Sequence, residues 1–418
     1  MEIKRDIYLK RLINRMHNGL IKVVTGVRRS GKSYLLLKLF VKYLREIGVS
    51  DDHILIMEFD RFENRKYRQP EELTAYLKER IKDADKYYVL LDEAQMLQHF
   101  EEVLNSLLRE DNLDIYVTGS NSKFLSKDIL TEFRGRGDET HIFPLSFAEF
   151  MQTSDKDTYQ AWADYIVYGG LPLLASMKTD EQKAKYLMNL FEETYIKDII
   201  ERNKLEKTRE LNDLLNILAS SVGSLTNFGK IEATFKSVLH SSVSSHTIGK
   251  YAEYLEDAFL IKKAFRYDVK GRKYIGSPVK YYFEDAGLRN ARLNFRQTEE
   301  THLMENIIYN ELRLRGFNVD VGEVNKRYMD KVSGKKLTRR LEIDFVANLG
   351  SKRYYIQSAY RLPDEEKLKQ EKASFLALKD SFKKIIIVKD TVKPMQDNNG
   401  ILTLGLFDFL LNENSLEW

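Results

Sequence analysis

The chain has 418 residues, of which 43% are hydrophobic and 31% charged, and 67 Lys and Arg against 63 Asp and Glu give a formal net charge of +4. This length and composition suit several packed domains, and so balanced a charge neither requires nor excludes a nucleic acid partner. The lack of cysteine excludes disulfides and thiolate metal sites. The N-terminus does not resemble a secretory signal, and no run approaches the roughly 18 apolar residues of a membrane span. We therefore expect a cytoplasmic protein without membrane contact.

The first motif, GVRRSGKS at residues 26–33, lies between an apolar strand and a predicted helix. It fits the GxxxxGK[ST] P-loop, whose glycines let successive backbone N–H groups point into one anion-binding concavity. We expect ATP here, with Lys32 at the β- and γ-phosphates and the Ser33 hydroxyl on Mg²⁺. The predicted nucleotide-binding residues are Gly26, Val27, Arg28, Arg29, Ser30, Gly31, Lys32, Ser33 and Tyr34.

The second motif is Lys86–Gln95 (KYYVLLDEAQ), an apolar strand that ends in two carboxylates. Downstream of a P-loop, this pattern is typical of a Walker B strand. We expect Asp92 to hold Mg²⁺ beside Ser33. Glu93 is the predicted catalytic residue that polarises or orients the attacking water, alongside Lys32.

A third predicted strand, Asp114–Ser120, ends in small polar residues. Asn121 or Ser120 could contact the γ-phosphate or the water, although an ordinary Gly-Ser-Asn turn explains the residues about equally well. In the RGRG segment that follows, Arg134 and Arg136 are candidates for an arginine that acts across a subunit boundary, with a solvated basic turn as the alternative. A short strand at His141–Ser146 completes the β–α units of a parallel three-layer sandwich.

These motifs, with FPLSFAEF and YGGLP further on, resemble a group of bacterial and archaeal AAA-type ATPases. The resemblance covers essentially the whole chain and implies an N-terminal P-loop module, a helical lid, a winged helix and a C-terminal domain that resembles restriction endonucleases. It also favours Arg136 over Arg134. We therefore expect an α/β P-loop domain at 1–150, a lid at 151–208, a winged-helix domain at 209–290 and a restriction-endonuclease-like α/β domain at 291–418.

The predicted winged helix combines a helix at Ser244–Ile261 with a hairpin around Lys270-Gly271-Arg272. A helix and a basic wing could bind double-stranded DNA, but winged helices also serve as protein-interaction or packing modules. The hairpin region has one acid, Asp268, and seven basic residues: Lys262, Lys263, Arg266, Lys270, Arg272, Lys273 and Lys280.

The C-terminal region shows a helix with Glu305, a strand with Glu342 and Asp344, and a further strand with Gln357 and Ala359. This order resembles the restriction-endonuclease-like core, whose chemistry needs acids around Mg²⁺ and a lysine. Glu305 and Asp344 match acid positions, and with Gln357 they form a candidate second metal site. Ala359 cannot replace the lysine, and Lys352 and Arg353 lie at the other end of the strand, so we expect a degenerate nuclease site.

The sequence thus predicts a Mg²⁺-dependent ATPase that uses ATP to switch a winged-helix and nuclease-like module on DNA, and it leaves room for a homo-oligomer. Two alternatives stay open. One is an ATP-gated nuclease with a divergent metal site. The other is a nucleotide-dependent protein-interaction switch that does not bind DNA.

Overall fold

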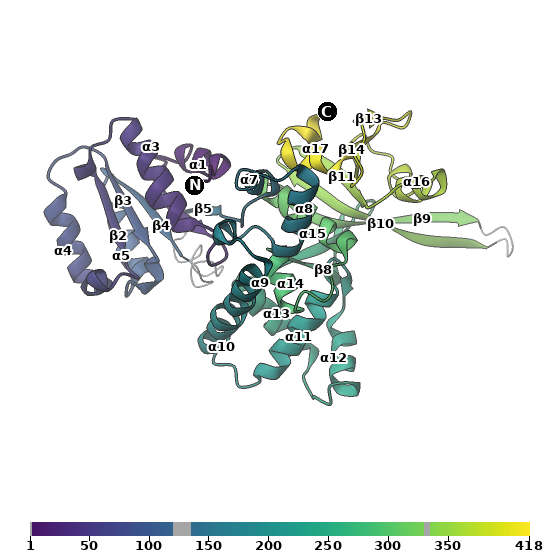
Figure 1. Cartoon of the computed structure of the whole chain (residues 1–418), viewed down its shortest axis with the longest axis horizontal. Coiled ribbons are helices and arrows are strands. Elements are labelled where there is room, and N and C mark those ends of the chain that lie inside the picture. The colour runs from purple at the N-terminus through teal and green to yellow at the C-terminus, as the bar shows by residue number, and fades with distance from the viewer. Residues whose placement is uncertain (1, 120–134, 330–334) are drawn as a thin grey trace. The chain divides into compact units, whose positions relative to one another are not determined.

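The structure is a computed structural model that describes residues 2–119, 135–329 and 335–418, without the side chain of Thr194. It divides into two compact units (Figure 1). The N-terminal unit contains residues 1–145 with the short segments 171–175 and 257–259. The C-terminal unit contains residues 146–170, 176–256 and 260–418.

The N-terminal unit is built on a five-stranded sheet in the order β2-β3-β4-β1-β5, in which every neighbouring pair is parallel. The P-loop strand β1 and the acidic strand β3 are separated by β4. The strands are β1 (Ile21–Thr25), β2 (Ile54–Glu58), β3 (Tyr87–Asp92), β4 (Leu113–Thr118) and β5 (Gly137–His141).

Helices cover both faces of this sheet, which confirms the α/β sandwich. On one face, α4 and α5 pack Leu73, Leu77 and Leu104 into the core with strand residues such as Val89. On the other face, Phe40 of the helix that follows the P-loop packs on Tyr116, with ring centroids 4.6 Å apart. The helical segments are α1 (Asp6–Ile13), α2 (Lys32–Tyr34), η1 (Leu35–Phe40), α3 (Val41–Glu46), η2 (Asp51–His53), η3 (Phe62–Arg68), α4 (Pro70–Arg80), η4 (Ala94–Met96) and α5 (Phe100–Leu107).

The fifth strand lies earlier than predicted. We expected it at His141–Ser146, where the residues are apolar, but β5 is the polar segment Gly137–His141. An edge strand pairs on one side only and can therefore be polar. The apolar residues after β5 form a loop rather than a strand. In this loop the Ile142 N–H still donates to the Thr25 carbonyl oxygen (2.8 Å), and Phe143 is buried.

The C-terminal unit contains a mixed nine-stranded sheet in the order β13-β14-β12-β11-β10-β9-β7-β8-β6. The predicted wing hairpin (β7 and β8) is therefore continuous with the C-terminal strands, because β7 pairs in parallel with β9. The strands are β6 (Leu225–Thr226), β7 (Ile261–Asp268), β8 (Lys273–Phe283), β9 (Asn318–Met329), β10 (Lys336–Leu349), β11 (Lys352–Ala359), β12 (Lys383–Val388), β13 (Met395–Gln396) and β14 (Ile401–Gly405).

The main core of this unit joins helices from both ends of its sequence. Trp162, from the predicted lid, is buried with Phe147 just before the lid and with Ile308 and Phe409 from the C-terminal region. The division into lid, winged helix and C-terminal domain stays a prediction. The helical segments are α7 (Phe147–Met151), α8 (Thr158–Tyr168), α9 (Asp180–Asn189), η7 (Leu190–Ile196), α10 (Lys197–Asn203), α11 (Thr208–Ser220), α12 (Phe228–Ser237), α13 (Ser245–Asp257), α14 (Ala286–Arg292), α15 (Glu300–Leu314), α16 (Glu365–Lys372), η8 (Phe375–Ala377), α17 (Leu406–Leu411) and η9 (Ser415–Glu417).

The two glycines of the YGGLP motif, Gly169 and Gly170, pack against the start of α14. The Gly170 N–H donates to Asp285 Oδ2 (2.7 Å), and a Cβ on Gly169 would lie 2.2 Å from Asp285 Oδ1. Across the same contact, a Cβ on Gly287 would lie 1.9 Å from the Tyr168 carbonyl oxygen. Glycine at 287 is therefore required by close approach to backbone, whereas Gly169 is favoured by its positive φ of 73° and by the neighbouring Asp285 carboxylate. A search of the described helices finds none with the length and apolarity to cross a bilayer.

Candidate functional site

The P-loop follows β1 with backbone angles that favour glycine. Gly26 has φ = 136°, and a Cβ there would lie 2.2 Å from the Ile142 carbonyl oxygen. Gly31 has φ = 96° and directly precedes α2. Arg29 is exposed with φ = 66°, whereas Val27 and Ser30 are buried. The loop therefore has the turn conformations that let backbone N–H groups converge on an anion.

Lys32 is buried at the centre of this loop. Its Nζ donates to the carbonyl oxygens of Gly26 (3.0 Å) and Val27 (3.1 Å). Burial lowers the pKa of Lys32 to about 8, although the carboxylates of Glu93 and Asp92 oppose the shift. A buried ammonium group beside a loop of this shape is suited to bind phosphate oxygens.

Ser33 and Asp92 lie together at the carboxyl edge of the sheet. The Ser33 hydroxyl donates to Asp92 Oδ1 (2.9 Å), and the Thr118 hydroxyl donates to the same oxygen (2.5 Å). Burial raises the pKa of Asp92, and these two hydrogen bonds oppose the rise. A carboxylate and a hydroxyl beside a phosphate cradle are the oxygen ligands that Mg²⁺ prefers, so the residues fit the predicted Mg²⁺–ATP site.

Glu93 follows Asp92 in a left-handed backbone conformation, with φ = 53°. Its N–H donates to Thr118 Oγ1 (3.0 Å), and its carboxylate accepts from the Gln95 amide. A non-glycine residue at positive φ costs free energy, and such residues concentrate at functional sites. The conformation places Glu93 directly after β3, beside Asp92.

Thr118 and Arg5 are site residues that the sequence analysis missed. Thr118 is the last residue of β4 and lies near the carboxyl end of the strand predicted at Asp114–Ser120. That position was the signal that could have identified it. Arg5 is 3% exposed and donates to the carbonyl oxygens of Ser30 (3.0 Å) and Phe143 (2.7 Å). No motif marks Arg5, because its partners Ser30 and Phe143 lie 25 and 138 positions away along the chain.

The structure describes only one of the other two predicted catalytic residues, Asn121 and Arg136. Asn121 lies outside the described residues, as do Ser120 and Arg134. Arg136 is exposed, and its guanidinium donates a long hydrogen bond to Asn105 Oδ1 (3.5 Å). Its action in a neighbouring subunit stays a prediction.

In the C-terminal unit, the predicted acids surround a lysine from β8. Lys280 Nζ lies 3.0 Å from Glu305 Oε1 and 2.7 Å from Glu342 Oε1. Tyr282 also donates to Glu305 Oε1 (2.6 Å), and the Ser358 N–H donates to Asp344 Oδ2 (2.7 Å). We define Lys280, Glu305, Glu342 and Asp344 as the Lys280 cluster.

The electrostatics of this cluster are dominated by burial. The pKa of Asp344 is raised well above its ordinary value by burial and by Glu305, while Lys280 opposes the rise. Nearby, Gln357 Oε1 is buried and accepts no hydrogen bond from the residues that the structure describes. Lys352 pairs with Glu417 and Arg353 donates to Asn348, so neither takes the place of the lysine missing at position 359. The cation at the acids is Lys280.

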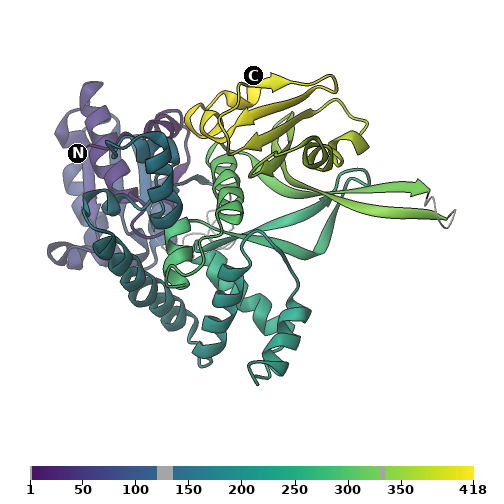
Figure 2. The same cartoon turned by 45° about the vertical axis from the view of Figure 1, so that its right-hand side comes forward.

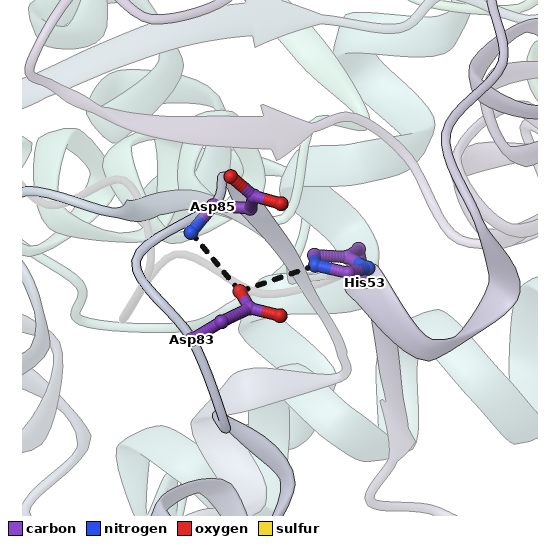
Figure 3. A group of neighbouring side chains, drawn as sticks. All are labelled: His53, Asp83 and Asp85. Atoms are coloured by element: carbon purple, nitrogen blue, oxygen red, sulfur yellow. Dashed lines mark hydrogen bonds and ion pairs between the residues drawn. The ribbon is translucent and has the colours of Figure 1, made fainter.

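A small group with possible metal ligands lies on the surface of the N-terminal unit (Figure 3). His53 Nε2 lies 3.3 Å from Asp83 Oδ1, and that oxygen also accepts from the Asp85 N–H (3.0 Å). Both carboxylates are exposed. Since these contacts explain the arrangement, we assign no metal to it.

The predicted DNA-binding wing exposes fewer basic side chains than its sequence contains. Arg266 forms an ion pair with Glu323, Lys263 with Glu256 (3.6 Å), and Lys280 is buried in its cluster. Four of the seven cations remain exposed on this hairpin: Lys262, Lys270, Arg272 and Lys273.

Comparison with known proteins gives two domain matches and two long relatives. Residues 18–151 match the AAA_14 family, an AAA domain, and residues 159–299 match a domain of unknown function, DUF8612. An uncharacterised protein of Haemophilus influenzae is 33% identical over 415 residues, which cover 98% of each chain. An uncharacterised protein of Methanocaldococcus jannaschii is 30% identical over 396 residues, which cover 90% of this chain and 82% of the relative.

Among solved structures, the Aeropyrum pernix ORC1 protein in complex with DNA is 13% identical, covering 70% of this chain and 92% of that chain, with a TM-score of 0.29. So weak a likeness carries no argument about ligands. The two domain matches end at residue 299, and the restriction-endonuclease-like assignment therefore stays a prediction.

Proposed function

The chain belongs to one family with these uncharacterised proteins of H. influenzae and M. jannaschii, and because its residues 18–151 match an AAA domain, we propose that it is a Mg²⁺-dependent ATPase that switches its C-terminal unit on DNA. The observation that carries this proposal is the convergence of Lys32, Ser33, Asp92 and Glu93 at one edge of the parallel sheet. Two of these residues, Ser33 and Asp92, are in direct contact.

Each residue would have one task in hydrolysis. The loop N–H groups and Lys32 bind the phosphates, and Ser33 and Asp92 hold Mg²⁺, which when bound neutralises charge on the phosphate oxygens. Glu93 orients a water molecule and accepts its proton as the water attacks the terminal phosphate. Thr118 positions both acids, because its hydroxyl donates to Asp92 and accepts from the Glu93 N–H.

The test is ATP hydrolysis by the full chain, with and without duplex DNA. Glu93→Gln should reduce turnover by about 10²- to 10⁴-fold and leave ATP binding intact, because the amide keeps the shape but cannot accept the proton. Glu79→Gln, an exposed change on α4, is the matched control. Absence of hydrolysis by the wild type in both conditions would overturn the proposal.

For the DNA part of the proposal, the support is the exposed cations of the C-terminal unit. Duplex DNA binding that differs between the ATP-bound Glu93→Gln protein and the nucleotide-free protein is the expected result. Binding that is equal in both states would reject the switch while leaving the ATPase in place. Arg136 would act in an oligomer, so Arg136→Ala should reduce turnover only at concentrations at which the chain self-associates.

The Lys280 cluster favours a second candidate function, metal-dependent cleavage of DNA. A nuclease of the predicted type needs acids and a lysine near one scissile phosphate, and Lys280 supplies the lysine from β8. In the alternative arrangement, Lys280 is an internal cation that neutralises Glu305 and Glu342 in place of a metal. Incubation of plasmid DNA with the chain, ATP and Mg²⁺ or Mn²⁺ separates the two.

Cleavage that is lost in both Asp344→Ala and Lys280→Met would support the nuclease. Absence of cleavage in every condition would reject it. In that case, Lys280 neutralises buried acids, and Lys280→Met should lower the midpoint of thermal unfolding strongly because an unpaired buried charge is left behind.

A further inference from the structure

Strands β9 and β10 continue past the body of the sheet as a two-stranded ribbon (Figures 1 and 2). Strand β9 extends to Met329 and pairs with β10 back to Lys336. From residue 326 to 329 and from 336 to 340, every side chain is exposed. None of these side chains packs into a hydrophobic core, so burial does not explain why the strands extend this far.

The described ribbon is basic on both faces. Lys326 and Arg339 lie on one face, with Tyr328 and Leu337 beyond them, whereas Arg327, Lys336 and Arg340 lie on the other. Residues 325–329 and 335–340 include no Asp or Glu.

Lys326 lies directly opposite Arg339 in the antiparallel register. Like charges in directly opposed cross-strand positions destabilise a ribbon. An anion bound against both side chains would remove this cost. The paired cations are therefore more favourable when a polyanion is bound to the ribbon than when the ribbon is free in solution.

The wing adds cations at the same end of the sheet. Because β7 runs parallel to β9 with Asp268 opposite Glu323, the turn after β7 lies beside the base of the ribbon. Lys270 Nζ donates to the Asn325 carbonyl oxygen (3.2 Å), which ties the wing tip to the ribbon. Arg272 is exposed at this tip.

We propose that the β9–β10 ribbon, together with Lys270 and Arg272 at the wing tip, is a contact surface for double-stranded DNA. A two-stranded ribbon fits the major groove of B-form DNA, and cations on both of its faces can reach the phosphates on either side. Duplex RNA is a poorer partner, because its major groove is too deep and narrow for such an element. The inference deepens the DNA part of the proposed function and is independent of ATP hydrolysis.

The experiment measures binding of the full chain to a labelled random-sequence DNA duplex at several salt concentrations. Lys326→Gln/Arg339→Gln removes one lysine and one arginine from the ribbon. The matched control, Lys78→Gln/Arg80→Gln, removes the same residue types from exposed positions on α4. We expect the ribbon variant to bind about tenfold or more weakly, with a log-affinity against log-salt slope shallower by roughly 2, because two phosphate contacts are lost.

Several outcomes overturn the inference in distinguishable ways. A ribbon variant that binds like the control overturns the ribbon surface alone. A wild type that binds no duplex overturns both the ribbon surface and the DNA part of the proposed function, while ATP hydrolysis still tests the ATPase. Binding to anionic vesicles that needs the ribbon, without binding to DNA, would replace the duplex with a membrane surface. Unchanged circular dichroism and ATP turnover in the ribbon variant confirm that it is folded.

Discussion

The Thr118 hydroxyl donates to Asp92 Oδ1 at 2.5 Å and accepts from the backbone N–H of Glu93 at 3.0 Å. One side chain on β4 thereby holds both acids at the end of β3. The geometry of the proposed metal and water sites consequently depends on a residue that belongs to neither the P-loop motif nor the Asp92-Glu93 motif.

Thr118→Val keeps the shape of this side chain and removes both hydrogen bonds. We expect kcat for ATP hydrolysis to fall by about tenfold or more with a smaller change in KM, because misplacement of catalytic groups affects chemistry more than binding. Thr118→Ser keeps the hydroxyl and should retain most of the activity. A Val variant as active as the Ser variant would contradict the positioning role.

Arg5 should support the P-loop from outside it. Its guanidinium fork joins the Ser30 and Phe143 carbonyl oxygens, and a lysine cannot reach both in the same geometry. We expect Arg5→Lys to weaken ATP binding several-fold and to lower the free energy of unfolding by about 1–3 kcal/mol, because a buried carbonyl oxygen loses its partner.

Titration calorimetry with ATP and chemical denaturation measure these two effects of Arg5→Lys. Arg45→Lys, an exposed arginine paired with Asp51, is the control and should change neither. If Arg5→Lys changes unfolding but not ATP affinity, Arg5 supports the fold and has no influence on the loop.

The sequence predicted those parts of the site whose contacts are local. The P-loop and the Asp92-Glu93 pair are contiguous motifs, and the parallel order of their strands follows from the β–α alternation. Thr118, Arg5 and Lys280 were missed because each acts through residues distant in the sequence. Arg5 reaches Phe143, 138 positions away, and no periodicity encodes such a contact.

The ribbon was missed for a different reason. Burial alternates along a strand only while one face packs on a core, and the exposed residues beyond Val324 therefore resemble a polar loop. Backbone pairing alone extends the strands there. The same reasoning explains β5, whose polar residues concealed an edge strand.

Two helical glycines in the C-terminal unit should respond to alanine with opposite signs. A Cβ on Gly287 in α14 would lie 1.9 Å from the Tyr168 carbonyl oxygen, whereas one on Gly249 in α13 would make an ordinary 3.6 Å contact with the Phe228 ring. Gly287→Ala should therefore cost about 3 kcal/mol or more of unfolding free energy, as a backbone clash forces the two segments apart.

Gly249→Ala should stabilise the unit by up to about 1 kcal/mol, because alanine has the higher helix propensity. Denaturant unfolding of both variants measures the contrast. Equal effects of the two changes would mean that the contact between Tyr168 and α14 is not tight.

Asp285 should give the stability of the chain a specific pH dependence. Burial raises its pKa to about 6 and the charge of Glu284 adds to the rise, although N–H groups of Gly170 and Leu288 donate to its carboxylate and oppose it. In the unfolded chain, an aspartate titrates near its ordinary value of about 3.9. Between these two values, the folded state binds the proton more readily than the unfolded state does.

Stability from Asp285 is therefore greatest at low pH and falls as the pH rises from about 4 to about 6, by at most about 3 kcal/mol. Asp285→Asn does not titrate, so the difference in unfolding free energy between wild type and variant should decline over this window and stay constant above it. Denaturant unfolding from pH 4 to pH 7 measures the difference. Parallel profiles for the two proteins would show that the carboxyl of Asp285 titrates alike in the folded and unfolded states.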